Sequence, residues 1–134
     1  MTNSNQKVTP GRIRLLLVDD EAGFVNVLCK RISRRNIEVT TACSGSEAIQ
    51  ALRGREFDVA LLDLKMEDMN GLEVLKIFRI MDPKLAVIML TGHGSAEAAR
   101  QGLELGAFDY LTKPVELGEL LEKIKAAYQD RKYL

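Results

Sequence analysis

Short runs of consecutive apolar residues recur along the chain, and longer segments of mixed polarity separate them. Four runs stand out, at residues 13–18 (IRLLLV), 57–62 (FDVALL), 85–90 (LAVIML) and 107–112 (AFDYLT). Continuous apolar runs of this length are typical of parallel strands that are buried on both faces of a sheet. We predict a further strand, second along the chain, at residues 37–41 (IEVTT). From residue 13 onward the pattern is therefore a strand followed by a helix, repeated five times.

The segments between these strands carry apolar residues at helical spacing. Helices are predicted at residues 21–35, 44–53 and 72–81, from Ser95 onward, and from Leu117 onward. Ser44 and Glu47 have the spacing of a capping box at the start of the second helix. The last helix has the clearest apolar stripe, which consists of Leu117, Leu120, Leu121, Ile124, Ala127 and Tyr128.

The fourth helix differs from the others because it has few large apolar residues. With Ser95 as its N-cap, it is expected to bury Ala96, Ala98, Ala99 and Leu103, and Gly102 interrupts it. Burial contributes roughly 25 cal/mol per Å² of apolar area, so an alanine face anchors a helix less than a leucine face. Two interpretations follow: the helix shifts at modest cost, or small residues let it pack closely.

Short connections and right-handed crossovers limit the ways in which these elements are joined. We predict an α/β fold with a single doubly wound, five-stranded parallel sheet of flavodoxin-like order 2-1-3-4-5 and five helices. The domain is expected to cover residues 13–131. Residues 1–12 are polar, contain a Pro-Gly break, and are predicted to form a disordered N-terminal tail.

Composition narrows the function classes. The 134 residues include 19 basic and 19 acidic side chains, so charge gives no support for a nucleic-acid or membrane partner. No apolar stretch approaches the roughly 18 residues of a membrane span, and no signal peptide opens the chain. The two cysteines, Cys29 and Cys43, are interpreted as buried thiols in a reducing compartment. The sequence therefore predicts a cytoplasmic protein.

Polar residues close most of the apolar runs. Asp19 and Asp20 follow the first strand, Asp63 the third, and Lys113 the fifth, whereas the fourth run ends at Thr91. The carboxyl ends of parallel strands lie along one edge of the sheet, where open α/β folds place their ligand sites. Taken singly, these residues have structural explanations as helix caps, turn formers or solvated loop residues. Their joint placement favours a shared site.

Crowded carboxylates suggest a metal. Two of them repel by roughly 4 kcal/mol at 4 Å with an effective dielectric of 20, and a divalent cation removes that conflict. Mg²⁺ prefers oxygen ligands. An aspartate beside Mg²⁺ attacks phosphoryl groups, and an ammonium and a hydroxyl group such as those of Lys113 and Thr91 bind phosphoryl oxygens. The pattern predicts Mg²⁺-dependent phosphoryl transfer.

The chain resembles the receiver domain of two-component response regulators. The matching motifs are LLLVDDE at 15–21, LLDLKM at 61–66 followed by Gly71, MLTGHGS at 89–95 and GAFDYLTKP at 106–114. The resemblance extends from about Arg12 to Tyr128.

The resemblance implies a role for each residue of the predicted site. Asp63 is the phosphoacceptor, and Asp20 is a direct ligand of the Mg²⁺ cofactor. Asp19 is a water-mediated Mg²⁺ ligand, and the backbone carbonyl of Lys65 is a third ligand of the ion. The resemblance also makes Thr91 the switch hydroxyl, Lys113 the phosphate-binding lysine and Tyr110 the aromatic residue that changes rotamer with the switch. It further implies a cis Lys113–Pro114 peptide bond.

Three positions vary from the family pattern or within it. Glu67 stands where proline commonly occurs, so the conformation of that loop is left open. Lys65 and His93 lie two residues beyond Asp63 and Thr91. The resemblance places them where side chains tune the attack of water on the phosphoryl group, and we predict that they set the phosphate lifetime. The alternative for His93 is an ordinary loop histidine.

The implied function is that of a phosphorelay receiver rather than an enzyme. A sensor histidine kinase or phosphotransfer protein donates the phosphoryl group, and a downstream output domain or protein responds. The response comes from the surface of the fourth helix, fifth strand and fifth helix, which also offers a homodimer interface. A Mg²⁺-dependent aspartate-nucleophile phosphatase or phosphotransferase is the alternative, although Lys65 occupies the position of its second aspartate. A flavodoxin-like cofactor binder is disfavoured because VDDEAG is acidic where a phosphate would bind.

Overall fold

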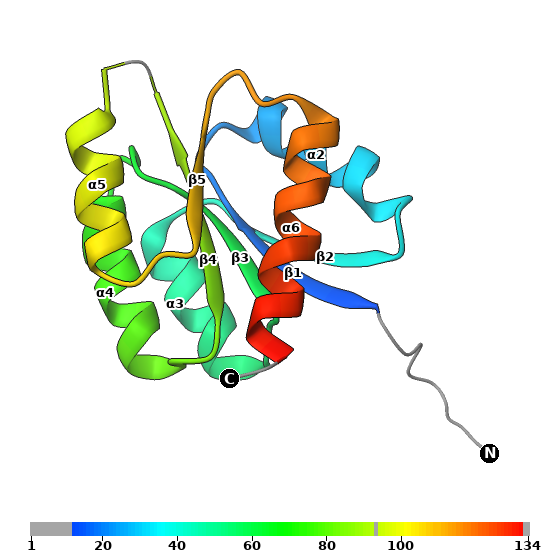
Figure 1. Ribbon diagram of the computed structural model, residues 1–134, viewed down its shortest axis with the longest axis horizontal. Coiled ribbons are helices and arrows are strands. Elements are labelled where there is room, and N and C mark those ends of the chain that lie inside the picture. Colours follow the sequence, from blue (N-terminus) through cyan, green and yellow to red (C-terminus); the bar gives the residue numbers. More distant parts are fainter. Residues whose placement is uncertain (1–11, 93, 133–134) are drawn as a thin grey trace.

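Five parallel strands form one sheet, with helices on both of its faces (Figure 1). The computed structural model describes residues 12–92 and 94–132, and the predicted N-terminal tail therefore lies almost wholly outside the described residues. The elements in chain order are β1 (Ile13–Val18), α2 (Ala22–Ser33), β2 (Ile37–Ala42), α3 (Gly45–Gly54), β3 (Val59–Asp63), α4 (Gly71–Met81), β4 (Ala86–Thr91), α5 (Ala96–Glu104), β5 (Asp109–Thr112) and α6 (Leu117–Lys132).

The strand order is β2-β1-β3-β4-β5, which confirms the predicted topology. The register pairs Val18 with Leu62 and Asp63 with Leu90, so the ends of β1, β3 and β4 are level. Thr91 is paired in turn with Thr112 of β5. Consequently, the residues that follow these strands share one edge of the sheet.

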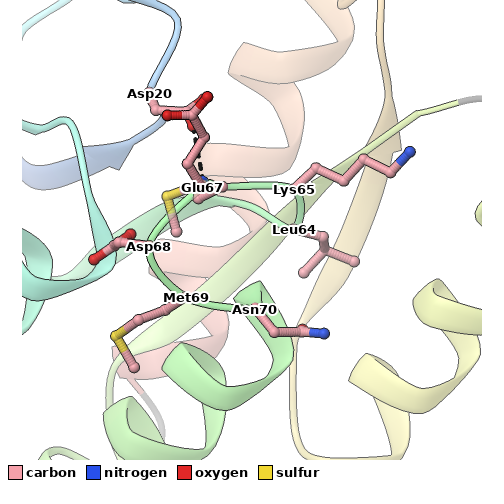
Figure 2. A pocket seen from close by; sticks show the side chains of 8 residues that line it. Asp20, Leu64, Lys65, Glu67, Asp68, Met69 and Asn70 are labelled. Atoms are coloured by element: carbon pink, nitrogen blue, oxygen red, sulfur yellow. Dashed lines mark hydrogen bonds between the residues drawn. The ribbon is translucent and has the colours of Figure 1, made fainter.

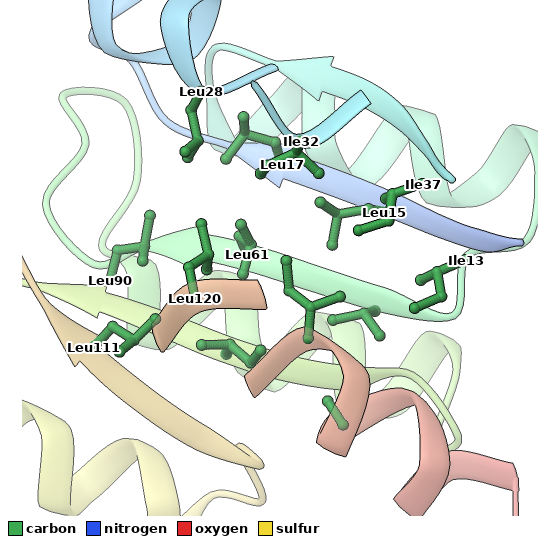
Figure 3. Packing of buried hydrophobic residues seen from close by; sticks show 14 of the residues in the cluster. Ile13, Leu15, Leu17, Leu28, Ile32, Ile37, Leu61, Leu90, Leu111 and Leu120 are labelled. Carbon is green, nitrogen blue, oxygen red and sulfur yellow. The ribbon is translucent and has the colours of Figure 1, made fainter. Parts of the chain in front are cut away.

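Each face of the sheet has its own hydrophobic core. On one face, β1, β3 and β4 pack against α2 and α6 through residues such as Leu17, Leu61 and Leu120 (Figure 3). On the other face, α3, α4 and α5 cover the alternate residues of the same strands, among them Leu16 and Leu62. Because β1 and β3 are buried on both faces, their sequences are continuously apolar.

Helix caps follow the sequence in part. The Ser44 side chain accepts a hydrogen bond from the Glu47 backbone N–H at 3.1 Å, as predicted for α3. The Glu47 carboxylate reaches one residue further back than a capping box requires and accepts the N–H of Cys43 at 3.0 Å. Ser95 is the N-cap of α5, but its side chain makes no capping hydrogen bond.

The contacts of α5 differ from those expected. Its buried residues are Ala99 and Gly102, whereas Ala96 is exposed and Leu103 is 41% exposed. Burial of Ala96 and Leu103 was therefore a wrong prediction. Gly102 allows the helix to lie close to β4, because a Cβ atom there would be 2.0 Å from Sδ of Met89. The buried face of α5 is thus smaller than the sequence suggested.

The expectation of two buried thiols is also wrong. Cys29 is half-buried, and Cys43 is exposed because it lies just beyond the last residue of β2. The Cys43 thiol donates a hydrogen bond to Oε2 of Glu47 at 3.2 Å, and this contact raises the pKa of the thiol. The Lys113–Pro114 peptide bond is cis, as the resemblance implied. In the described part of the chain, no helix is both long and apolar enough to cross a membrane.

Candidate functional site

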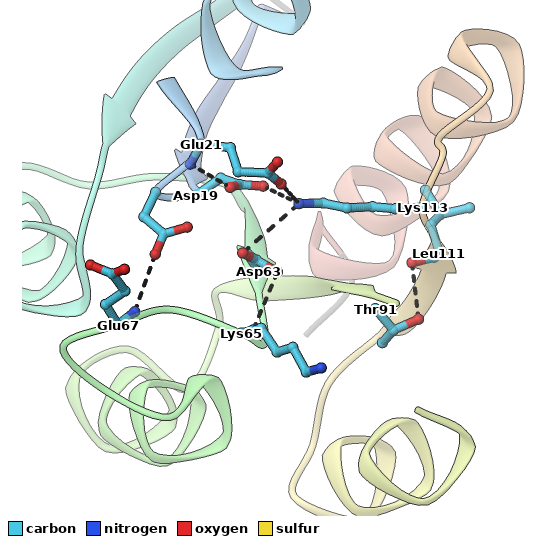
Figure 4. A network of polar contacts seen from close by, with 9 residues as sticks. Asp19, Glu21, Asp63, Lys65, Glu67, Thr91, Leu111 and Lys113 are labelled. Atoms are coloured by element: carbon cyan, nitrogen blue, oxygen red, sulfur yellow. Dashed lines mark hydrogen bonds and ion pairs between the residues drawn. The ribbon is translucent and has the colours of Figure 1, made fainter. Parts of the chain in front are cut away.

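Three strand ends bring the predicted acidic residues and the lysine together (Figure 4). Asp63 is the last residue of β3, and Asp19 directly follows β1, where its backbone N–H donates to the Ala42 carbonyl at 3.1 Å. Lys113 directly follows β5, and its backbone N–H donates to the Thr91 carbonyl at 2.7 Å. The sheet itself therefore fixes the backbone positions of these side chains.

The carboxylates of Asp19, Asp20 and Asp63 form a compact cluster. One oxygen from each lies within 4.8 Å of the others. Asp19 is fully buried and Asp63 is 6% exposed, while Asp20 is the most accessible of the three. Burial of Asp63, followed by the negative charge of Asp19, raises the pKa of Asp63 to about 6. The Asp63 carboxylate therefore ionises in a poorly solvated position beside Asp19.

Lys113 partly compensates for this charge. Its Nζ lies 2.7 Å from Oδ2 of Asp19, 2.8 Å from Oε1 of Glu21 and 3.9 Å from Oδ2 of Asp63. The ammonium group also sits 4.6 Å from the centre of the Phe24 ring. Burial lowers the pKa of Lys113, but the hydrogen bonds to Asp19 and Glu21, together with the negative charges of Asp63 and Asp19, outweigh burial and raise it overall. Lys113 is therefore protonated in the site.

Glu21 is a contact that the sequence analysis missed. It is the third acidic residue of the DDE run and lies outside the cluster of three carboxylates. The only signal in the sequence was its position next to Asp20. Its hydrogen bond with Lys113 lowers the pKa of the Glu21 carboxyl group.

The loop between β3 and α4 folds back over the acidic cluster. The backbone N–H of Lys65 donates to Oδ1 of Asp63 at 3.3 Å, and that of Glu67 donates to Oδ2 of Asp20 at 3.1 Å. A proline at position 67 would have no N–H to donate, so the unusual glutamate adds a bond to this site. The sequence left the conformation of this loop open, and the structure shows a loop that is hydrogen-bonded to Asp20 through the Glu67 backbone.

A groove of about 500 Å³ lies beside Asp20, lined by this residue and residues 64–70 (Figure 2). Asp68, at its rim, accepts hydrogen bonds from the backbone N–H groups of Gly45 and Ser46 at the start of α3. The groove leaves the Asp20 side of the cluster open to small molecules.

Three other predicted residues lie in β4, in β5 and in the loop after β3. Thr91 is 4% exposed, and its hydroxyl donates to the Leu111 carbonyl at 3.3 Å. Tyr110 is 40% exposed on β5. The Lys65 side chain is exposed and extends away from Asp63 (Figure 4). His93 lies outside the described residues.

The donor set fits a hard divalent cation. Three carboxylate oxygens within 4.8 Å match the preference of Mg²⁺ for oxygen ligands, and the groove leaves room for water or phosphate oxygens. Burial, and then the negative charge of Asp19, raise the pKa of Asp63 even though Lys113 lies nearby and lowers it. A cation at this position would relieve the remaining repulsion.

The model for the response regulator receiver domain matches residues 15–125. The chain belongs to this family. Receiver domains are the signalling modules of two-component systems. Their general function is to accept a phosphoryl group, and they generally bind Mg²⁺ at an acidic pocket.

Known relatives are similar over most of this receiver domain. Transcriptional regulatory protein GlrR of Escherichia coli (strain K12) is 36% identical over 115 residues, which are 86% of this chain and 26% of GlrR. Photosynthetic apparatus regulatory protein RegA of Cereibacter sphaeroides is 36% identical over 112 residues, which are 84% of this chain and 61% of RegA. The chain thus spans about a quarter of the length of relatives such as GlrR.

Solved structures support the same assignment. A response regulator receiver domain protein from Clostridium thermocellum superposes with a TM-score of 0.87 at 32% identity. The match covers 90% of this chain and 98% of that protein. The fold and strand order of this chain therefore agree with its assignment to the receiver-domain family.

Proposed function

We propose that Asp63 accepts a phosphoryl group from the phosphohistidine of a sensor histidine kinase or phosphotransfer protein. A carboxylate oxygen of Asp63 attacks phosphorus and forms a P–O bond. The P–N bond of the donor breaks, and its electron pair returns to the imidazole nitrogen. The observation that supports this assignment is the position of Asp63, which is clustered with Asp19 and Asp20 and lies 3.9 Å from the ammonium group of Lys113.

We assign Asp19, Asp20, Asp63 and the backbone carbonyl of Lys65 as the residues that hold Mg²⁺. When bound, Mg²⁺ supplies positive charge that neutralises phosphoryl oxygens. Lys113 contributes a further positive charge, because its ammonium group already lies 3.9 Å from Asp63. The buried position of Asp19 keeps its carboxylate fixed toward Lys113, at 2.7 Å.

The proposed output is a change at the surface of α5, β5 and α6. Phosphorylation adds close to two negative charges at the sheet edge, and the Thr91 hydroxyl group turns toward the phosphoryl group that carries them. Three observations support this change: the Thr91 hydroxyl makes a 3.3 Å hydrogen bond to a carbonyl, Tyr110 is exposed, and α5 is anchored by few buried residues. The altered surface contacts an output domain or protein, or a second copy of the chain. Lys65 and His93 set the phosphate lifetime.

The alternative, an aspartate-nucleophile phosphatase, uses a second acidic residue two positions after the nucleophile. That position holds Lys65, whose side chain points away from Asp63 (Figure 4). The chain therefore assists its own phosphorylation and dephosphorylation but is not a turnover enzyme.

Incubation with phosphoramidate or acetyl phosphate and Mg²⁺, followed by intact mass spectrometry, tests this function. We expect a gain of one phosphoryl group that is absent from Asp63→Asn. Asp68→Asn is the matched control, because Asp68 lies in the same loop but outside the acidic cluster. A phosphoryl group retained by Asp63→Asn would refute the assignment of the acceptor. Multiple turnover of a small phosphoester would favour the phosphatase.

A further inference from the structure

The ammonium group of Lys113 is shared between two carboxylates that differ in environment. Nζ lies 2.7 Å from Asp19 and 2.8 Å from Glu21, both hydrogen-bond distances, but 3.9 Å from Asp63 (Figure 4). Two of its three N–H groups thus bind residues other than the proposed phosphoacceptor.

Asp19 and Glu21 would lose different amounts of stabilisation if Lys113 moved away from them. The Asp19 side chain is 0% exposed, whereas the Glu21 side chain is 64% exposed. Without Lys113, the buried Asp19 carboxylate would keep the backbone N–H of Glu21, at 3.0 Å, but would lose its counter-charge where water does not reach it. Such a loss is strongly destabilising, whereas the exposed Glu21 carboxylate regains water. Glu21 is therefore the partner that Lys113 releases more readily.

A phosphoryl group on Asp63 would place new anionic oxygens next to Lys113. To reach hydrogen-bond distance, Nζ has to move closer than its present 3.9 Å from Asp63. Since Asp19 holds the ammonium group from the buried side, the movement draws Lys113 away from Glu21. Glu21 and the phosphoryl oxygens therefore compete for the same ammonium group. The Glu21 carboxylate also repels an incoming phosphate dianion.

We propose that Glu21 is a positioning residue: it holds the ammonium group of Lys113 away from Asp63 and so weakens the binding of phosphoryl donors at Asp63. This inference rests on the proposed function. The competition for Lys113 and the repulsion by Glu21 act on the bound donor as well as on the transition state. They therefore change the donor concentration that gives half-maximal rate more than they change the rate at saturation. Since one partner is exposed, the pair resembles a surface ion pair and is worth a factor of roughly 1.5 to 5 in an equilibrium constant.

The test compares Glu21→Gln with the unaltered chain over a range of acetyl phosphate concentrations at fixed Mg²⁺. Glutamine keeps the length and the acceptor oxygen of the side chain but removes its charge. We expect the half-saturation concentration to fall by roughly 1.5- to 5-fold, a smaller change in the rate at saturation, and a smaller difference between the two proteins at high salt. Intact mass spectrometry measures the phosphorylated fraction over time.

Glu38→Gln is the matched control. Glu38 forms an exposed ion pair with Arg55 at 3.0 Å near the start of β2, at the opposite edge of the sheet from the site. Removing this equal charge should leave the half-saturation concentration unchanged. An unchanged or higher value in Glu21→Gln would overturn the inference while leaving the proposed function intact. Failure of the unaltered chain to be phosphorylated would instead overturn the proposed function, and this inference with it.

Discussion

Asp63 carries its carboxyl group in a place where ionisation is unfavourable. The side chain is almost wholly buried, Asp19 lies beside it, and Lys113 is 3.9 Å away. Burial and then Asp19 raise the pKa of Asp63 to about 6, compared with 3.8 for an unperturbed aspartate. The same crowding that makes the site suitable for a cation therefore destabilises the fold when no cation is bound.

In the metal-free protein, the contribution of Asp63 to stability should be lost as the pH rises from about 4 to above 6. In this range the folded chain holds the Asp63 proton more tightly than the unfolded chain, so folding becomes less favourable as protons are removed. Asp63→Asn cannot ionise, and we expect it to be more stable than the unaltered chain by up to about 3 kcal/mol at pH 7.5. Urea unfolding with a chelator at a series of pH values measures this difference.

The difference between the two proteins isolates Asp63 from other titrating groups. It should shrink steadily as the pH falls to about 4.5, where Asp63 is neutral in the folded chain. A difference that stays constant between pH 4.5 and 7.5 would contradict the raised pKa.

At the scale of elements, the strands were more predictable than the helix contacts. β1 matches its apolar run residue for residue, and β4 is displaced from its run by one. Strands buried on both faces leave a strong signal, because every residue must be apolar. In α5, alanines are compatible with several helix orientations, so the sequence did not show that Ala96 and Leu103 face solvent.

The same contrast applies to the site. The convergence of Asp19, Asp63 and Lys113 follows from a parallel sheet, because strand order alone brings their backbones together. The Glu21–Lys113 contact joins residues 92 positions apart and depends on the rotamers of two long side chains. The bond from the Glu67 backbone depends on the path of a loop. Neither leaves a periodic pattern in the sequence.

The start of α4 offers a test of how tightly the site loop is packed. A Cβ atom on Gly71 would lie 2.4 Å from Cα of Leu64 and 2.8 Å from the Asp63 carbonyl oxygen. Both are backbone atoms, which have little freedom to move. We expect Gly71→Ala to lower the free energy of unfolding by about 1–3 kcal/mol and to slow phosphorylation of Asp63. Urea unfolding and intact mass spectrometry measure the two effects.

Gly23→Ala provides the control for the helix propensity of alanine. Gly23 lies in the first turn of α2, and a Cβ atom there would meet nothing within 4 Å. This substitution should leave stability unchanged or raise it by up to about 1 kcal/mol. A Gly71→Ala protein as stable as Gly23→Ala would show that the loop yields without strain.

At the scale of the whole molecule, the charges balance in number but not in position. Acidic and basic side chains are equal in number, yet three carboxylates gather at one edge of the sheet. Because the unfolded chain does not hold these groups together, a cation that binds the cluster stabilises only the folded state. Mg²⁺ affinity should therefore appear as thermal stability of the entire domain.

We expect the melting temperature at pH 7.5 to rise with Mg²⁺ concentration. At a free concentration one hundred times Kd, the stabilisation is about 2.7 kcal/mol, which corresponds to roughly 10 °C for a domain of this size. Asp20→Asn should lose most of this rise, and its accessible position means that the substitution disturbs packing less than one at Asp19. Asp68→Asn should retain the rise, since Asp68 lies outside the cluster. If K⁺ at matched ionic strength raised the melting temperature as much as Mg²⁺, the effect would be general screening and the proposed metal site would be refuted.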